Sequence, residues 1–467
     1  MMMPGDENES RRVRWVVLAA FTLCSVNQSL IWGTFNASPD AVEKYYKWDG
    51  DSDATKVTLD LLLNWGPISY VVVVWFVMIC MSRGDPAALW WLSLCGTVLS
   101  FAGSAIRLIP TVAGTAEKGS AKLFLHFGQF LNGCSGPMWA ATPSALSSLW
   151  FEPEQRMLAT GISYVGSILG PTLGLFIGRY IRTASQVPGL LFAECALTIF
   201  ATAAWMFCPK VPAVAPSKSC AAKFDTFRAT GATPWRECAI RLYHDVKGVC
   251  GRDFAMLSIS GGLITGVFNC WTANLPLILQ NSISSGLSNW LGVVGNLACV
   301  VGTVTLSAIQ ERCFKSKLKR IIIGCFAVQF IFYAIFCLSL PIGTITSKAI
   351  IPTNAAILLA SLAIASAGVG ASSPAFYELG AEITFPAHEE ISAGLISFLN
   401  NAGGMVLLSL LSTIAQNWDS LLVVITVLIS AALMFAVNEK YARRNLDQSD
   451  SAVVREQRES MKTPLLF

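Results

Sequence analysis

The sequence predicts an all-α membrane protein with twelve transmembrane helices in two six-helix halves. Only 13% of the 467 residues are charged and 54% are hydrophobic, whereas soluble domains carry roughly 25% charged residues. Apolar runs of about 20 residues, the length that crosses a bilayer as a helix, recur twelve times along the chain. A longer polar and basic stretch separates the sixth run from the seventh.

The twelve runs divide equally around this polar stretch. The first six occupy residues 15–35, 57–81, 87–109, 123–144, 157–180 and 188–207. The second six occupy residues 254–279, 287–309, 321–340, 349–372, 391–414 and 420–437. We therefore expect an N-terminal tail (1–14), an N-terminal half (15–209), a connector (210–252), a C-terminal half (253–438) and a C-terminal tail (439–467).

The distribution of charge predicts the orientation in the membrane. Lysine and arginine are concentrated in the two tails, the connector and the loop at 312–320, which share one side if the helices alternate. The loop after the first run is instead acidic, with Asp40, Glu43, Asp49, Asp51 and Asp53. Because basic loops stay in the cytosol, we expect both termini to be cytosolic.

Other classes of protein are disfavoured. The net charge is only +4 and the basic residues are dispersed, so no nucleic-acid partner is expected. The 14 cysteines form no CxxC pair, which argues against a metal site. The spans contain no HExxH or GxSxG motif, so we expect no enzyme and no cofactor. The expected partners are the lipid bilayer and a small-molecule substrate, bound by a monomer.

Two six-helix halves joined by a basic cytosolic connector resemble the major facilitator superfamily, in which the halves rock about a central site. Within it, several motifs resemble solute carrier family 49. These are LHFGQFLNGCSGPMWAATPSALSSLWFEPEQR, LLNWGPISY, AIRLIP, GVFNCW and FYELGAEITFP. LNGCSGP and NWGPI resemble the disrupted in renal carcinoma 2 branch more than the feline leukaemia virus receptor-related choline and heme carriers.

The resemblance implies a substrate site that aromatic residues of the first and seventh helices enclose. It places Trp32 and Trp271 there, with Gln28 and Asn269 nearby. Further polar candidates are Asn27, Gln129 and Asn400. An indole face attracts a cation and also stacks on flat rings. The alternative is that these tryptophans belong to the aromatic belts at the membrane interfaces.

The resemblance also bears on the substrate. The choline carriers use glutamines on the fourth and eleventh helices, where this chain has Gly136 and Gly404, so choline is disfavoured. The resembling branch implies export of pyridoxine (vitamin B6) by a secondary active transporter, with proton coupling or exchange. Choline, ethanolamine or heme transport is the alternative within the family, and a non-transporting receptor or scaffold is the alternative of another class. The branch implies a lysosomal location, with the plasma membrane left open.

Ionisable residues within or beside the spans are candidates for proton coupling or gating, because they are costly to bury in a membrane. Glu378 and Glu382 are four residues apart and share one helical face. One of them binds a proton, or the pair is a structural latch at the cytosolic edge. Arg107 and Asp60 lie near helix ends, where reaching water is easier.

Two loops resemble cytosolic gates of the superfamily. The loop CMSRGDPAAL keeps Arg83 of the charge latch between the second and third helices, but has Met81 and Pro86 where charges are expected. The loop WFEPEQR carries Glu154 and Arg156, which are candidates for the same role before the fifth helix.

The fifth run contains GISYVGSILGPTLG, with Gly161, Gly170, Pro171 and Gly174. Glycines let a neighbouring helix approach closely, and the proline removes a backbone hydrogen bond and bends the helix. The spacing resembles the antiporter signature of the superfamily, which implies contact with the eleventh helix at residues 402–404. The alternative is general glycine packing.

Overall fold

The computed structural model describes residues 4–35, 37–48, 52–279, 283, 285–313, 317–341, 349–385, 387, 389–411 and 419–442. Over these ranges the elements are helices joined by turns and short irregular segments. Each of the twelve apolar runs of the sequence corresponds to one long helix.

The N-terminal half comprises α1 (Pro4–Gly33), α3 (Ser52–Met81), α4 (Ala88–Val112), α5 (Ser120–Ala140), α7 (Arg156–Gly178) and α8 (Val187–Met206). The C-terminal half comprises α11 (Arg252–Ile278), α12 (Ser285–Cys313), α13 (Leu318–Leu338), α14 (Ala355–Thr384), α15 (Glu389–Leu411) and α16 (Asp419–Ala436). Among the described residues, nine of these helices are long and apolar enough to cross a membrane, and α15 and α16 are shorter apolar helices.

Helix α5 is not among these apolar helices, because it carries polar residues that face other helices. The side chains of Gln129 and Asn132 are fully buried in the bundle. A polar side chain in a membrane is tolerated where it faces protein partners rather than lipid. The composition of α5 therefore indicates a central position in the N-terminal half, against α3 and α4.

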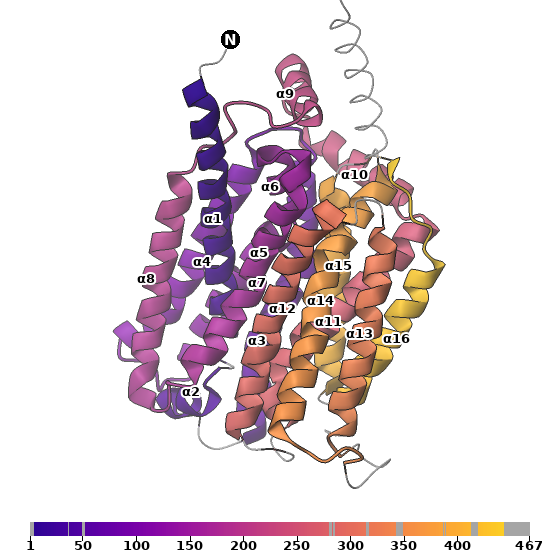
Figure 1. Ribbon diagram of the computed structural model, residues 1–467. Helices are drawn as coiled ribbons and strands as arrows, with labels where there is room; N and C mark the ends of the chain where they lie inside the picture. The colour runs from indigo at the N-terminus through magenta and orange to yellow at the C-terminus, as the bar shows by residue number, and fades with distance from the viewer. Residues whose placement is uncertain are drawn as a thin grey trace, which may run out of the picture.

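The two halves stand side by side, and shorter helices cap the two ends of the bundle (Figure 1). They meet along two seams, α7 against α12 and α3 against α15. The connector forms α9 (Lys218–Thr230) and α10 (Trp235–Val249), which lie at the same end as the start of α1. We call this the connector end. Helix α2 (Pro39–Tyr46) caps the opposite, far end.

Two predicted spans end at other residues in the structure. The fourth run was expected to continue to Ser144, but α5 ends at Ala140 and α6 (Pro143–Trp150) starts a new helix. Pro143 has no N–H and disfavours a helical conformation at Thr142. The tenth run was expected at 349–372, but α14 covers Ala355–Thr384. It begins where the Asn354 side chain accepts a 2.8 Å hydrogen bond from the Ala356 N–H.

Candidate functional site

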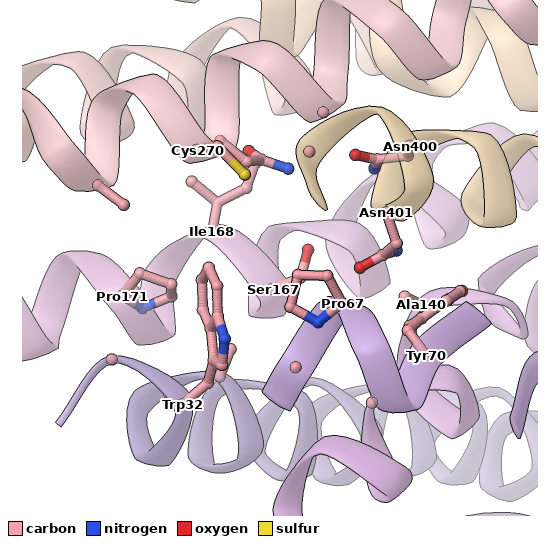
Figure 2. Close-up of a pocket in the computed structure, with 18 of the residues that line it drawn as sticks. Trp32, Pro67, Tyr70, Ala140, Ser167, Ile168, Pro171, Cys270, Asn400 and Asn401 are labelled. Carbon is pink, nitrogen blue, oxygen red and sulfur yellow. The ribbon is translucent and has the colours of Figure 1, made fainter. Parts of the chain in front are cut away.

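A central cavity of about 160 Å³ lies between the two halves. Helices α1, α3, α5 and α7 line it from one half, and α11, α12, α14 and α15 from the other (Figure 2). Because the cavity is lined by both halves, its shape changes when one half rocks against the other. The cavity is therefore the place where a bound solute and the conformation of the bundle influence each other.

The cavity lining is mainly apolar and carries several polar groups but no charged one among the described residues. None of the described residues that line it is Asp, Glu, Lys, Arg or His. Its polar groups are amides and hydroxyls, and they come from both halves. The principal ones are Gln28, Ser167, Asn269, Asn400, Asn401 and Tyr377. Such a lining offers hydrogen bonds to a neutral polar solute and no ion pair to a charged one.

Trp32 is the one tryptophan among the described residues that line the cavity. Its Nε1 donates a 2.8 Å hydrogen bond to the carbonyl oxygen of Leu63 on α3. Figure 2 shows its ring rising from α1 into the cavity, between Pro171 and Pro67. Because the polar edge of the indole is occupied, the ring is held in place and offers its faces to a ligand.

Three amides in the cavity are available to a ligand. Asn269 on α11, Asn296 on α12 and Asn400 on α15 form no side-chain hydrogen bond with other described residues. By contrast, Asn401 donates to the Ser397 carbonyl oxygen at 3.0 Å, and Gln28 donates to the Asn132 carbonyl oxygen at 3.2 Å. The C-terminal half therefore supplies the free donors and acceptors, opposite Trp32 of the N-terminal half.

Three of the predicted substrate residues lie outside the cavity. Trp271 is 1% exposed and packs edge-on against Tyr333 and Phe336 of α13. Asn27 accepts a 3.2 Å hydrogen bond from the Thr198 hydroxyl on α8. Gln129 donates to the Trp32 carbonyl oxygen at 2.9 Å from behind α1. Of the seven predicted substrate residues, the cavity brings together Gln28, Trp32, Asn269 and Asn400.

Both glycines at the positions that the resemblance matched to glutamines line the cavity. A Cβ at Gly136 would have its nearest neighbour, Gln28 Nε2, at 3.5 Å. A Cβ at Gly404 would lie 2.8 Å from the Cys270 sulfur. This chain therefore has no side chain at two positions on the cavity surface, and it lacks the polar contacts that glutamines would make there.

The connector end of the cavity is sealed by contacts between the halves. Ser397 of α15 donates to the Ala140 carbonyl oxygen of α5 at 3.1 Å, and its hydroxyl lies 3.0 Å from that of Tyr377. At the next residue of α15, the ring of Phe398 meets that of Trp75 edge-on. These contacts must break before a solute can leave the cavity at that end.

The predicted proton-coupling residues lie in different places. Arg107 is fully buried near the far end and forms an ion pair with Glu194 of α8, with 2.7 Å between Nη2 and Oε2. Glu382 is buried within α14, and Glu378 is half-buried one turn before it. Asp60 is half-buried near the start of α3. None of them lines the cavity.

Glu194 is the functional candidate that the motifs did not identify. It lies inside the sixth apolar run, in the segment LLFAECALTIF. A lone carboxylate within a membrane span marks a functional position by default. Applied to the predicted span at residues 188–207, this rule would have identified Glu194 from the sequence.

The candidate gating residues at the connector end contact the connector. The Arg83 guanidinium lies 4.3 Å from the centre of a Trp235 ring, and its Nε donates to the Thr233 carbonyl oxygen at 3.2 Å. Arg156 donates to the Ser217 hydroxyl at 2.8 Å. Glu154 is exposed in the turn before α7. Arg83 and Arg156, the arginines of the two predicted gate loops, therefore contact the connector rather than a neighbouring loop.

The glycines of the fifth span form a packing seam, but against other helices than expected. Gly170 abuts Ser29, Leu30 and Val26 of α1, and Gly161 abuts Ser307 of α12. Helix α7 packs mainly on α1 and α12, whereas α15 packs mainly on α11 and α3. The expected contact between the fifth and eleventh helices is therefore wrong. Gly404 of α15 faces Gly266 and Cys270 of α11 instead.

Comparison with known proteins decides the family. The family model described as Major Facilitator Superfamily matches residues 87–408. The chain belongs to the major facilitator superfamily. This superfamily member is a membrane transporter rather than an enzyme, as its family and fold establish.

Relatives support the assignment of this superfamily member to solute carrier family 49. It is 24% identical to the solute carrier family 49 member 4 homolog of Xenopus tropicalis, over 96% of both chains. It is 20% identical to the choline/ethanolamine transporter flvcr2a of Danio rerio, over 83% of this chain and 77% of that protein.

A solved structure confirms the fold of the superfamily. The proton:xylose symporter XylE, bound to 6-bromo-6-deoxy-D-glucose, superposes with a TM-score of 0.66. The match covers 92% of this chain and 97% of XylE at 12% identity. The twelve helices of this protein are therefore arranged as in a facilitator.

Proposed function

We propose that this transporter exports or exchanges a small, uncharged, single-ring solute of the pyridoxine type, with coupling to protons. The observation that supports the proposal is the central cavity, whose described lining residues combine one indole face with free amides and include no ionised side chain. A pyridine ring stacks on the indole. The hydroxyl groups of such a solute pair with amides such as Asn269 and Asn400.

The alternatives within the family fit this lining less well. Heme carries two carboxylates, and no cationic side chain among the described lining residues would pair with them. A macrocycle also needs more room than a cavity of about 160 Å³. Choline or ethanolamine remains the second candidate, because the face of Trp32 attracts a cation. Gly136 and Gly404, however, supply no polar side chain to orient it.

We further propose that both termini and the connector lie in the cytosol and that residues 15–209 and 253–438 are the moving halves. The described residues after α16 bond to the connector-end starts of α11 and α13, through Asn438 to Asp253 and Tyr441 to Leu318. They therefore lie at the same end as the start of α1. The basic loops favour the cytosol for this end. We also propose that the protein is a monomer and lies in the lysosomal membrane.

Uptake into proteoliposomes tests the proposed substrate. Labelled pyridoxine should enter liposomes that contain the protein, with saturation, and an imposed pH gradient should accelerate it. Trp32→Ala should remove the uptake, while Trp271→Phe, which changes a ring outside the cavity, should retain it. Uptake of choline in preference to pyridoxine would establish the alternative substrate. Binding of pyridoxine without any flux would indicate a receptor.

A further inference from the structure

A closed polar network surrounds the buried ion pair of the N-terminal half. Arg107 is 0% and Glu194 2% exposed. Glu194 Oε2 accepts from Arg107 Nη2 at 2.7 Å, and its Oε1 lies 2.6 Å from the Thr34 hydroxyl. Arg107 Nη1 also reaches the Gln129 side-chain oxygen at 3.1 Å. Side chains from α4, α5 and α8, with Thr34 just after α1, thus meet at one ion pair.

The Thr34 hydroxyl can bond to Glu194 in either protonation state. Its oxygen lies 2.6 Å from Glu194 Oε1 and 2.8 Å from the Ile31 carbonyl oxygen, and it accepts from Arg107 Nη1 at 3.3 Å. When Glu194 is ionised, the Thr34 hydroxyl donates to the carboxylate, and the Ile31 carbonyl oxygen accepts from Arg107 and Gln129 at 3.3 Å. If Glu194 is protonated, it donates to the Thr34 oxygen, and Thr34 donates to the Ile31 carbonyl. A proton on Glu194 therefore reverses this hydrogen bond without moving a heavy atom.

Glu194 borders a second hollow, apart from the central cavity. It lines a groove of about 490 Å³ between α1, α7 and α8, and Gln186 lines the same groove. Gln186 precedes α8 at the far end, about two helical turns from Glu194. Because the Glu194 side chain is only 2% exposed, the groove leads up to the carboxylate without opening onto it. The groove and the cavity share no lining residue among those described, so a proton that reaches Glu194 along the groove does not pass the solute site.

Few other titratable groups face this carboxylate. Arg107 comes from α4, Tyr46 from α2, and Cys195 is its neighbour on α8. From α1 and α5 the described neighbours are Thr34 and Gln129, which do not titrate, and the turn 184–186 contributes Gln186. Arg107 is thus the single ionised partner of Glu194 among the described residues.

The network continues to the cavity through α1. Arg107 and Gln129 both donate to the Ile31 carbonyl oxygen at 3.3 Å, and Gln129 also donates to that of Trp32 at 2.9 Å. The ring of Trp32 lines the cavity. The charge state of the ion pair therefore acts on the turn of α1 that carries the substrate-facing indole.

We propose that Glu194 is the site that binds the transported proton, and that Arg107, Thr34 and Gln129 transmit its charge state to α1. This inference rests on the proton coupling in the proposed function, and it assigns that coupling to the pair in the N-terminal half rather than to Glu378 and Glu382. The step is a protonation: one O–H bond forms on Glu194 Oε1, and the Thr34 hydroxyl proton turns toward the Ile31 carbonyl.

The direction of the coupling follows from the buried charge. When Glu194 is protonated, Arg107 is left as an uncompensated cation at 0% exposure, a costly arrangement. Proton binding therefore disfavours the present state, in which the connector end is sealed, relative to a state with a rearranged N-terminal half. Acid at the far end favours opening toward the connector end, which is the direction of export into the cytosol.

Two measurements on the full chain in lipid test the assignment. Infrared difference spectra across a pH titration report the C=O stretch of protonated carboxyl groups. Proteoliposome assays then compare uptake driven by a pH gradient with exchange at equal pH. Glu194→Gln removes the proton site but leaves Arg107 as an unpaired cation. The double variant Arg107→Gln with Glu194→Gln removes that cation as well, so it is less prone to misfold. Glu382→Gln is the matched control, a second buried carboxylate.

We expect a titrating carboxyl band in the parent that is lost in both Glu194 variants and retained in Glu382→Gln. Gradient-driven accumulation should fall at least tenfold in the double variant, while exchange at equal pH persists. A band that survives in the folded double variant, or that disappears in Glu382→Gln instead, overturns the assignment. If the parent transports no pyridoxine at all, the proposed substrate fails, while the infrared result still decides the proton site.

Discussion

Gly66 of α3 lies directly against the indole of Trp32 on α1. A methyl group at position 66 would overlap Nε1 of that ring and lie 2.7 Å from its Cδ1. The ring therefore occupies the space that a side chain on α3 would fill. This contact, with the hydrogen bond to Leu63, fixes the aromatic wall of the cavity.

Gly66→Ala should therefore displace Trp32 and weaken substrate binding. Overpacking by one methyl group costs about 1–3 kcal/mol, which is roughly a fivefold to 150-fold loss of affinity if the cost falls on the bound state. Titration of pyridoxine against the purified protein measures it. Gly33→Ala is the control, because its Cβ would meet nothing closer than Pro171 at 3.9 Å. Equal affinities in the two variants would contradict a fixed role for Trp32.

Asn400→Ala should raise the KM for the transported solute. Its amide is free in the cavity, and a lost hydrogen bond costs about 1 kcal/mol, or roughly fivefold in affinity. Thermal stability should hardly change, since the amide has no partner among the described residues. Asn401→Ala is the comparison, because the Asn401 amide donates to the Ser397 carbonyl oxygen and its loss should lower stability instead. A change in stability without a change in KM would assign Asn400 a structural role.

Gly170→Ala should destabilise the protein, whereas Gly174→Ala should not. A Cβ at position 170 would lie 2.5 Å from the Leu30 backbone nitrogen and 2.6 Å from the Val26 carbonyl oxygen, and backbone atoms cannot move aside cheaply. At position 174 the nearest atom is Leu30 Cδ1 at 3.7 Å. Thermal unfolding in detergent should show a loss of about 1–3 kcal/mol for the first variant alone. Similar unfolding temperatures would contradict a tight α1–α7 seam.

Cysteine labelling tests the orientation of the connector. Cys250 is exposed after α10, while Cys220 and Cys238 are buried. Burial also raises the pKa of the Cys220 and Cys238 thiols, so little of the reactive thiolate exists at neutral pH. A membrane-impermeant maleimide should label Cys250 first, from the cytosolic face only. Labelling of the other two should increase as the pH rises. Labelling of Cys250 from the opposite face would reverse the proposed topology.

The sequence predicted the positions of the spans well, because about 20 apolar residues are needed wherever a helix crosses a bilayer. It also predicted that Trp32, Gln28, Asn269 and Asn400 would matter together, and the structure brings these four residues to one cavity. The C-terminal end of α14 was misjudged. Serines such as Ser372 and Ser373 interrupt the apolar run, yet both are buried inside a helix that continues to Thr384.

The tertiary structure alone determined which way each helix faces. A membrane helix is apolar on all sides, so periodicity gives little information about its rotation. Trp271 and Asn269 are two residues apart on α11, and only Asn269 lines the cavity, while Trp271 packs on α13.

The same reason explains the ion pair and the glycine seam. The sequence by itself placed Arg107 and Glu194 in membrane helices, where each charge needs a partner. They are 87 residues apart, and only the packing of α4 against α8 makes them partners. Likewise, the glycines of the fifth span required a close neighbour, and the arrangement of the bundle made that neighbour α1. Composition and length determine that a helix crosses the membrane, and long-range packing determines what each of its faces touches.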